Sequence, residues 1–195
     1  LISLFQGAKG LTVATYKVLL IGEPNVGKSS IIRRLLLGEF DERYHATVGV
    51  DLSAVPLNID PITPVILTLI DLGGQEDFSA LRTQYYRGAH YAFLVYDVAD
   101  RYSFECLNSW HEGLMSSVTQ QKKTEIPGIV LANKKDLSNK REIPASEGRK
   151  YAEELNWPFF ECSAKTGENI EEVFMRIAKE LYADYPPRGL PTHKK

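Results

Sequence analysis

The chain has 195 residues, of which 44% are hydrophobic and 25% are charged, a balance typical of a single globular domain. The formal net charge of -2 excludes a strong global field that would attract nucleic acid or an anionic membrane. No run of about 18 apolar residues occurs, so we expect no transmembrane segment. The two cysteines, Cys106 and Cys162, lack metal-ligand spacing, and we interpret them as free thiols of a cytoplasmic protein.

A regular pattern of predicted elements begins near residue 16. Residues 16–22, with the sequence YKVLLIG, form an apolar run that ends in glycine and predicts a buried strand. Residues 28–38, KSSIIRRLLLG, predict a helix that ends at Gly38. Residues 1–15 have no such pattern and predict an N-terminal extension.

Two apolar segments that follow predict a hairpin. Residues 50–59 and 64–71 flank the turn-like sequence DPIT. Pro56 and Pro64 favour an edge position for the first of these strands, because proline has no N–H to donate to a neighbour.

The second half of the chain continues the alternation of strands and helices. Residues 91–98 and 127–136 are continuous apolar runs that end in polar residues, and they predict buried strands. Residues 103–118 carry an apolar face at helical spacing. The remaining predicted elements are a helix over residues 145–156, a strand over 157–164 and a helix over 169–185. Such alternation predicts βαβ units and a largely parallel sheet, which binds ligands in loops at the carboxyl ends of its strands.

The first of these loops has the sequence pattern of a phosphate site. Residues 22–29, GEPNVGKS, fit the spacing G-x-x-x-x-G-K-[ST] between a strand and a helix. Successive backbone N–H groups and the helix N-terminus attract phosphate there. Lys28 adds a full charge, and the Ser29 hydroxyl is a ligand for Mg²⁺. A chance match is the alternative, and Pro24 raises a question because it has no N–H.

The sequence DLGGQE, residues 71–76, ends the next predicted strand. Asp71 is placed to anchor Mg²⁺ directly or through water. Gly74 can bring a backbone N–H close to a terminal phosphate, and Gln75 can orient an attacking water. Taken alone, DLGGQE could be a solvated turn, but the phosphate loop upstream favours a site.

Two further loops predict guanine recognition. The carboxylate of Asp136, in ANKKD, offers two acceptors that match the N1–H and N2–H₂ donors of guanine and repel adenine. The backbone amides of ECSAKTG, residues 161–167, can donate to the guanine carbonyl, with Lys165 packing along the base or ribose. For NKKD alone, a charged turn is the alternative.

Together, the motifs GEPNVGKS, DLGGQE, NKKD and ECSAK resemble those of the Ras superfamily of small GTPases over residues 16–183. The sequences HATVGVD (45–51) and YYRGAH (85–90) further resemble the Rab branch. The resemblance implies a three-layer P-loop NTPase fold of the α/β class. Its mixed, mostly parallel six-stranded sheet would have one antiparallel edge strand and about five helices. It also implies one G domain over residues 16–183, followed by a flexible tail over 184–195.

The resemblance assigns roles to individual residues. Thr47 is similar to the switch I threonine, whose hydroxyl joins Mg²⁺ and whose amide contacts the γ-phosphate only in the triphosphate state. Tyr44 matches the tyrosine that folds over the phosphates, and Phe40 matches the aromatic that stacks against guanine, although a core position explains Phe40 equally well. The implied catalytic residues are Gln75, Lys28 and Thr47, and the implied metal residues are Ser29, Thr47 and, through water, Asp71. The other implied contacts are those to phosphate from Asn25, Val26, Gly27, Lys28, Ser29, Ser30, Tyr44 and Gly74, and those to guanine or ribose from Phe40, Asn133, Lys134, Asp136, Ser163, Ala164 and Lys165.

The implied function is a GTP-binding switch that hydrolyses GTP slowly with Mg²⁺ and is accelerated by a partner. Residues 40–52 and 72–90 would be the switch regions that effectors, exchange factors and activating proteins bind. We assign no arginine finger within the chain. One alternative is a guanine-nucleotide-binding interaction module with little or no hydrolysis. Another is an ATP-dependent kinase or ATPase, which Asp136 disfavours.

Several positions depart from the family pattern. Ile70 stands where Rab-like proteins usually carry Trp, and Leu72 and Gly73 stand where Ras and Rab proteins usually show Thr-Ala. The double glycine of DLGG is closer to Arf-like proteins. No Met-Gly start and no C-terminal cysteine are present, so no lipid anchor is evident in this chain, and a peripheral membrane location stays open. Pro24 precedes the amides that bind phosphate, so we expect intact binding and an effect confined to hydrolysis.

Overall fold

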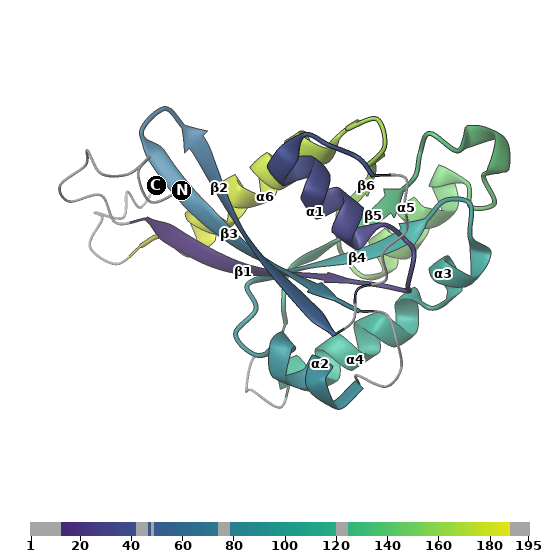
Figure 1. Ribbon diagram of the computed structural model, residues 1–195. Helices are drawn as coiled ribbons and strands as arrows, with labels where there is room; N and C mark the ends of the chain where they lie inside the picture. Colours follow the sequence, from purple (N-terminus) through teal and green to yellow (C-terminus); the bar gives the residue numbers. More distant parts are fainter. Residues whose placement is uncertain (1–12, 42–46, 48, 74–78, 120–124, 188–195) are drawn as a thin grey trace.

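The computed structural model describes residues 13–41, 47, 49–73, 79–119 and 125–187 (Figure 1). A central six-stranded sheet lies between two layers of helices, which confirms the expected three-layer α/β fold. None of the helices in these ranges is long and apolar enough to span a membrane.

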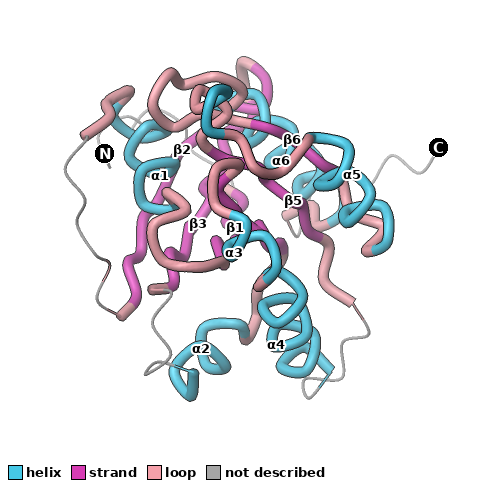
Figure 2. The backbone as a smooth tube through the Cα atoms, turned by 90° about the vertical axis from the view of Figure 1, so that its right-hand side faces the viewer, coloured by secondary structure: helices cyan, strands magenta, loops and turns pink. Residues whose placement is uncertain are grey.

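The strands follow the order β2-β3-β1-β4-β5-β6 across the sheet. Their bounds are Ala14–Ile21 (β1), Val50–Asp60 (β2), Thr63–Leu72 (β3), Tyr91–Asp97 (β4), Gly128–Asn133 (β5) and Phe159–Glu161 (β6). The strand β2 is antiparallel and occupies an edge, as the prolines predict, and every other neighbouring pair is parallel. The carboxyl ends of the parallel strands therefore meet at one end of the sheet, which Figure 2 views from the front.

Helices cover both faces of this sheet. Their bounds are Lys28–Leu37 (α1), Ser79–Tyr86 (α2), Arg101–Glu105 (α3), Leu107–Thr119 (α4), Ala145–Glu154 (α5) and Ile170–Asp184 (α6). In Figure 1, α1 and α6 lie on one side of the sheet, and α2 and α4 lie on the other. Because both faces are covered, the parallel strands read as continuous apolar runs.

The strand β1 shows how these runs divide between two cores. Val18 and Leu20 point into a core that includes side chains of α1 and α6. Leu19 and Ile21 point into a second core that includes side chains of α2, α4 and α5. The alternation follows from the two-residue period of a strand, and all four side chains are fully buried.

The helix predicted over residues 103–118 is divided at Cys106 into α3 and α4. A local anchor also lies at the end of β4. The Ser103 hydroxyl accepts the Asp97 N–H at 3.1 Å and donates to the Asp100 carbonyl at 2.8 Å. These bonds hold the short helix α3 against β4, while α4 packs along the sheet.

Two predicted strands are shorter than expected, and one α-helix was not predicted. The strand β5 ends at Asn133, because Lys134 adopts a left-handed φ of 63°. The strand β6 ends at Glu161, and the residues that follow turn back as a loop, where the Gly167 N–H donates to the Ser163 carbonyl at 2.8 Å. The helix α2 follows the DLGGQE segment, where no helix was predicted. The proposed extension and tail boundaries stay predictions.

Candidate functional site

The loop between β1 and α1 has a backbone shape that its glycines make possible. Gly22, Asn25 and Gly27 have φ values of 143°, 63° and 95°. A Cβ on Gly22 would overlap the carbonyl oxygen of Val95, and a Cβ on Gly27 would overlap the side-chain amide of Asn133. Left-handed backbone of this kind turns successive N–H groups toward one side, which is the geometry that binds an anion.

Lys28 lies at the centre of this loop and begins α1. Its side chain is only 6% exposed, and Nζ donates to the carbonyls of Gly22 at 2.7 Å and Glu23 at 2.9 Å. The ammonium group is therefore folded back over the loop instead of extending into solvent. Together with the positive N-terminal end of α1, it provides a fixed positive potential for phosphate.

Ser29, Thr47 and Asp71 converge from three separate segments beside Lys28. The Ser29 and Thr47 hydroxyls lie 2.8 Å apart, and Ser29 donates to Asp71 Oδ2. Thr47 Oγ1 donates to the same carboxylate oxygen at 3.3 Å. Two hydroxyls and one carboxylate are the hard oxygen ligands that Mg²⁺ takes together with water and phosphate oxygens.

The buried carboxylate of Asp71 is consistent with a cation site. The residue is 1% exposed, and within the described part of the chain its Oδ1 is a buried oxygen without a hydrogen-bond partner. Burial raises the pKa of this carboxyl, while the Ser29 hydrogen bond and the Lys28 charge act in the opposite direction. A divalent cation near Oδ1 would compensate the buried charge, so the donor set fits Mg²⁺.

Gly73 lets the segment that contains Thr47 lie against the end of β3. The Gly73 N–H donates to the Gly49 carbonyl at 2.9 Å. A Cβ on Gly73 would come within 2.7 Å of the Thr47 carbonyl oxygen and 2.9 Å of the Gly49 carbonyl oxygen. The absence of a side chain at this position is therefore required for the close approach seen here.

Asn133 connects the phosphate loop to the loop after β6. Its Nδ2 donates to the Val26 carbonyl at 2.8 Å, and its Oδ1 accepts the Ala164 N–H at 3.1 Å. The Cys162 thiol also lies 3.6 Å from Oδ1, and burial raises the pKa of this thiol. Asn133 thus fixes the positions of two proposed binding loops relative to each other.

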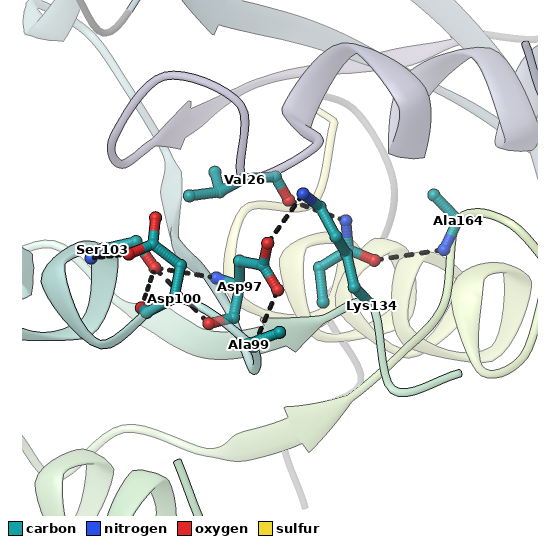
Figure 3. Close-up of polar contacts among 8 residues, drawn as sticks. Val26, Asp97, Ala99, Asp100, Ser103, Lys134 and Ala164 are labelled. Atoms are coloured by element: carbon teal, nitrogen blue, oxygen red, sulfur yellow. Dashed lines mark hydrogen bonds and ion pairs between the residues drawn. The ribbon is translucent and has the colours of Figure 1, made fainter. Parts of the chain in front are cut away.

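Lys134 is held by Asp97, which the sequence did not single out (Figure 3). Lys134 Nζ lies 2.7 Å from Asp97 Oδ2, and Asp97 Oδ1 accepts the Ala99 N–H at 2.9 Å. Because the Asp97 side chain is 10% exposed, this ion pair is mostly shielded from solvent. The pair therefore attaches the NKKD loop to the end of β4.

The remaining base-site candidates lie close to one another. The Ser163 hydroxyl donates to Asp136 Oδ1 at 2.5 Å, which orients the carboxylate predicted to recognise guanine. Lys165 is exposed on the same loop. Phe40 packs, partly buried, against the first core, as its core interpretation predicts, and its stacking on guanine stays a prediction.

Some predicted site residues lie outside the described residues or gain no specific contact. Tyr44, Gly74 and Gln75 fall outside the described ranges. Pro24 is exposed at the crest of the phosphate loop, and Ser30 is half-buried in α1. Their roles stay predictions.

Sequence reasoning missed three contacts besides the Asp97 ion pair. Trp110 of α4 donates from Nε1 to Glu23 Oε1 of the phosphate loop at 2.8 Å. Arg34 of α1 donates from Nε to the Ala164 carbonyl at 2.8 Å and also to the Lys165 carbonyl. No motif signals such contacts, because each joins residues that lie about 90 or 130 positions apart. Glu23, a charged residue inside the phosphate loop, was the one sign in the sequence of such a contact.

Comparison with known proteins agrees with this geometry. A family model described as "Ras family" matches residues 17–183. The chain is also 38% identical over 166 residues to "Ras-related protein RABE1e" of Arabidopsis thaliana, and the match covers 85% of this chain and 74% of that protein. The matched region contains all four loops of the candidate site.

Proposed function

The chain belongs to the Ras family of small GTPases and is Rab-like, and on this premise we propose that it is a guanine-nucleotide switch. It binds GTP with Mg²⁺, hydrolyses GTP slowly to GDP and phosphate, and changes its binding partners between the two states. The observation that carries the proposal is the convergence of Ser29, Thr47 and Asp71 beside the buried ammonium group of Lys28.

At the phosphate end, the chain binds the β- and γ-phosphates and holds them in place. Backbone N–H groups of residues 25–29 cradle the β-phosphate, and Lys28 neutralises charge on the outer oxygens. Ser29, Thr47 and, through water, Asp71 would hold Mg²⁺, which would supply positive charge to the phosphate oxygens. Gln75 orients the attacking water.

At the base end, the chain selects guanine. Asp136 accepts from the N1–H and N2–H₂ groups, and its orientation is supported by Ser163. Adenine would leave this carboxylate unpaired, which disfavours ATP strongly. Asn133 and Lys134 hold the loop, and Phe40 stacks against the base.

The switching step acts through Thr47. In the triphosphate state its amide contacts the γ-phosphate and its hydroxyl stays near Ser29 and Asp71. The Gly49–Gly73 backbone hydrogen bond supports this arrangement. Loss of the γ-phosphate removes the contact that holds the Thr47 amide. Residues 40–52 and 72–90 then change conformation and expose a different surface to effectors and regulators. By analogy with Rab-like proteins, we place this role in membrane traffic or signalling, at the cytoplasmic surface of a membrane or in the cytoplasm.

The nucleotide that co-purifies with the chain tests base specificity, after acid release and chromatography. We expect GDP. Single-turnover release of γ-phosphate then tests hydrolysis. Ser29→Ala should lose most Mg²⁺-dependent nucleotide affinity, and the matched control Ser146→Ala, an exposed serine on α5, should bind as the unmodified chain does. A co-purifying adenine nucleotide would refute the proposal.

Pro24 motivates a second candidate, a guanine-nucleotide-binding interaction module that hydrolyses little or nothing. Its ring is exposed at the crest of the loop, where the γ-phosphate, Gln75 and an activating arginine would meet. Bound GDP without phosphate release above the buffer rate would favour this candidate over the GTPase.

A further inference from the structure

Arg34 joins the phosphate helix to the loop proposed to bind the base. It lies on α1, six residues after Lys28. Its Nε donates to the Ala164 carbonyl at 2.8 Å, and Nη2 donates to the Lys165 carbonyl. Its Nη1 donates to the Gly38 carbonyl at the end of α1 at 2.5 Å. One guanidinium group therefore binds three backbone carbonyls, two in the loop after β6 and one at the end of α1.

These bonds fix the orientation of the loop's peptide planes. A trans peptide places its C=O and its N–H on opposite sides, and none of the described peptides is cis. Because Arg34 holds the carbonyls of Ala164 and Lys165, the N–H groups of Lys165 and Thr166 point away from α1. The Thr166 N–H shows this orientation directly, since it donates to Ser163 Oγ at 3.1 Å.

The opposite side of the loop is already bound to the guanine motif. Asn133 Oδ1 accepts the Ala164 N–H at 3.1 Å, and Asp136 accepts the Ser163 hydroxyl at 2.5 Å. Gly167, with a φ of 86°, brings the backbone close to the Arg34 stem. The NKKD loop thus fixes one side of this segment, and Arg34 fixes the other.

We propose that Arg34 is a positioning residue for guanine recognition. It orients the Lys165 N–H toward the carbonyl oxygen of the base and attaches the base loop to the phosphate helix. The inference rests on the proposed function, since it requires a bound guanine nucleotide. Arg34 itself does not touch the nucleotide.

Dissociation of fluorescently labelled GDP from the full chain in Mg²⁺ gives the first test. Arg34→Met keeps the aliphatic stem and removes every donor, so we expect about tenfold faster release, as for the loss of an orienting charged hydrogen bond. The matched control is Arg33→Met. Arg33 is the adjacent residue of α1, its side chain is 45% exposed, and its Nη1 lies 3.4 Å from Asp41 Oδ2. The control should stay within about twofold of the unmodified chain.

Base selectivity gives the second test, because a merely structural role would not change it selectively. One probe is GDP with sulfur in place of the base carbonyl oxygen, which weakens this acceptor and keeps the N1–H and 2-amino donors. The other is inosine diphosphate, which lacks only the 2-amino group. Arg34→Met should lose most of the preference for GDP over the sulfur analogue and keep the preference for GDP over inosine diphosphate. Arg34→Lys retains the charge and one donor group. Its preference for GDP over the sulfur analogue should lie between those of the unmodified chain and Arg34→Met.

The outcomes separate the inference from the proposed function. If Arg34→Met releases GDP at the unmodified rate, or loses both preferences equally, the positioning role is wrong while the GTPase proposal stands. If the unmodified chain binds ADP as well as GDP, the proposed function is wrong and the inference falls with it. A selective loss of carbonyl recognition with an unaffected Arg33→Met control supports the inference.

Discussion

Gly73→Ala is expected to weaken GTP binding while leaving GDP binding unchanged. The new methyl group would lie 2.7 Å from the Thr47 carbonyl oxygen and 2.9 Å from the Gly49 carbonyl oxygen. Both neighbours are backbone atoms, so they can yield only if the whole segment moves away from the end of β3. That movement would lengthen the 2.9 Å Gly73–Gly49 hydrogen bond and draw Thr47 away from Ser29 and Asp71.

The size of the effect follows from the contacts that would be lost. One backbone hydrogen bond contributes about 1 kcal/mol net, and withdrawal of the Thr47 hydroxyl from the Mg²⁺ site removes about as much again. A total of about 2 kcal/mol corresponds to a roughly 30-fold higher Kd. Because Thr47 is assigned to the triphosphate state alone, the Kd for GDP should change little. Titration with a non-hydrolysable GTP analogue and with GDP, both in Mg²⁺, measures the two constants.

Gly113→Ala is the matched control. A Cβ at Gly113, within α4, would meet no atom within 4 Å. The substitution should stabilise the fold by up to about 1 kcal/mol through helix propensity and leave both nucleotide affinities unchanged. Equal weakening of GTP and GDP binding by Gly73→Ala would refute the reasoning, as would no change in either. Ras and Rab proteins usually carry alanine at this position. The experiment therefore also tests whether the close approach of the Thr47 and Gly49 carbonyls to Gly73 contributes to GTP affinity.

Three further predictions concern separate parts of the site. Asp136→Asn should shift preference from guanine toward xanthine nucleotides, measured by competition binding, and an unchanged preference would mean that the base pocket lies elsewhere. Pro24→Gly should leave GDP affinity within about twofold and change single-turnover hydrolysis, and a large change in GDP affinity alone would contradict this. Burial raises the pKa of Asp71, so its ionised form destabilises the Mg²⁺-free fold at pH 7, and this penalty disappears as pH falls below the unfolded value of 3.8. Asp71→Asn should therefore raise the melting temperature in EDTA at pH 7 and abolish the further rise that Mg²⁺ gives, and a lower melting temperature in EDTA would argue against the burial penalty.

The fold was largely predictable because its signals are local. Continuous apolar runs that end in polar residues locate β1, β4 and β5, since strands covered on both faces need no polar alternation. Pro56 placed β2 at the edge correctly. The helix α2 was missed, because the segment after DLGGQE has only a weak apolar stripe. The attachment of α3 to the end of β4 involves the hydroxyl of Ser103, which no periodicity reveals.

The site was predictable as far as it consists of motifs. Short motifs at strand ends identify the loops, because the chemistry of phosphate and guanine restricts which residues can bind them. The contacts between loops were not predictable. Asp97 and Arg34 act on partners fixed by the packing of distant segments, and either residue alone would be an ordinary surface charge. Such residues can be recognised only after the sheet has brought the loops together.

The Trp110–Glu23 contact gives the chain an optical probe of its own. The indole N–H donates to a carboxylate of the phosphate loop, so its emission should respond to any shift of that loop. The chain's only other tryptophan, Trp157, packs against Gly128 and His111, away from the loop. With Trp157 replaced by Phe, the fluorescence of a single unlabelled side chain would follow nucleotide exchange and hydrolysis in real time.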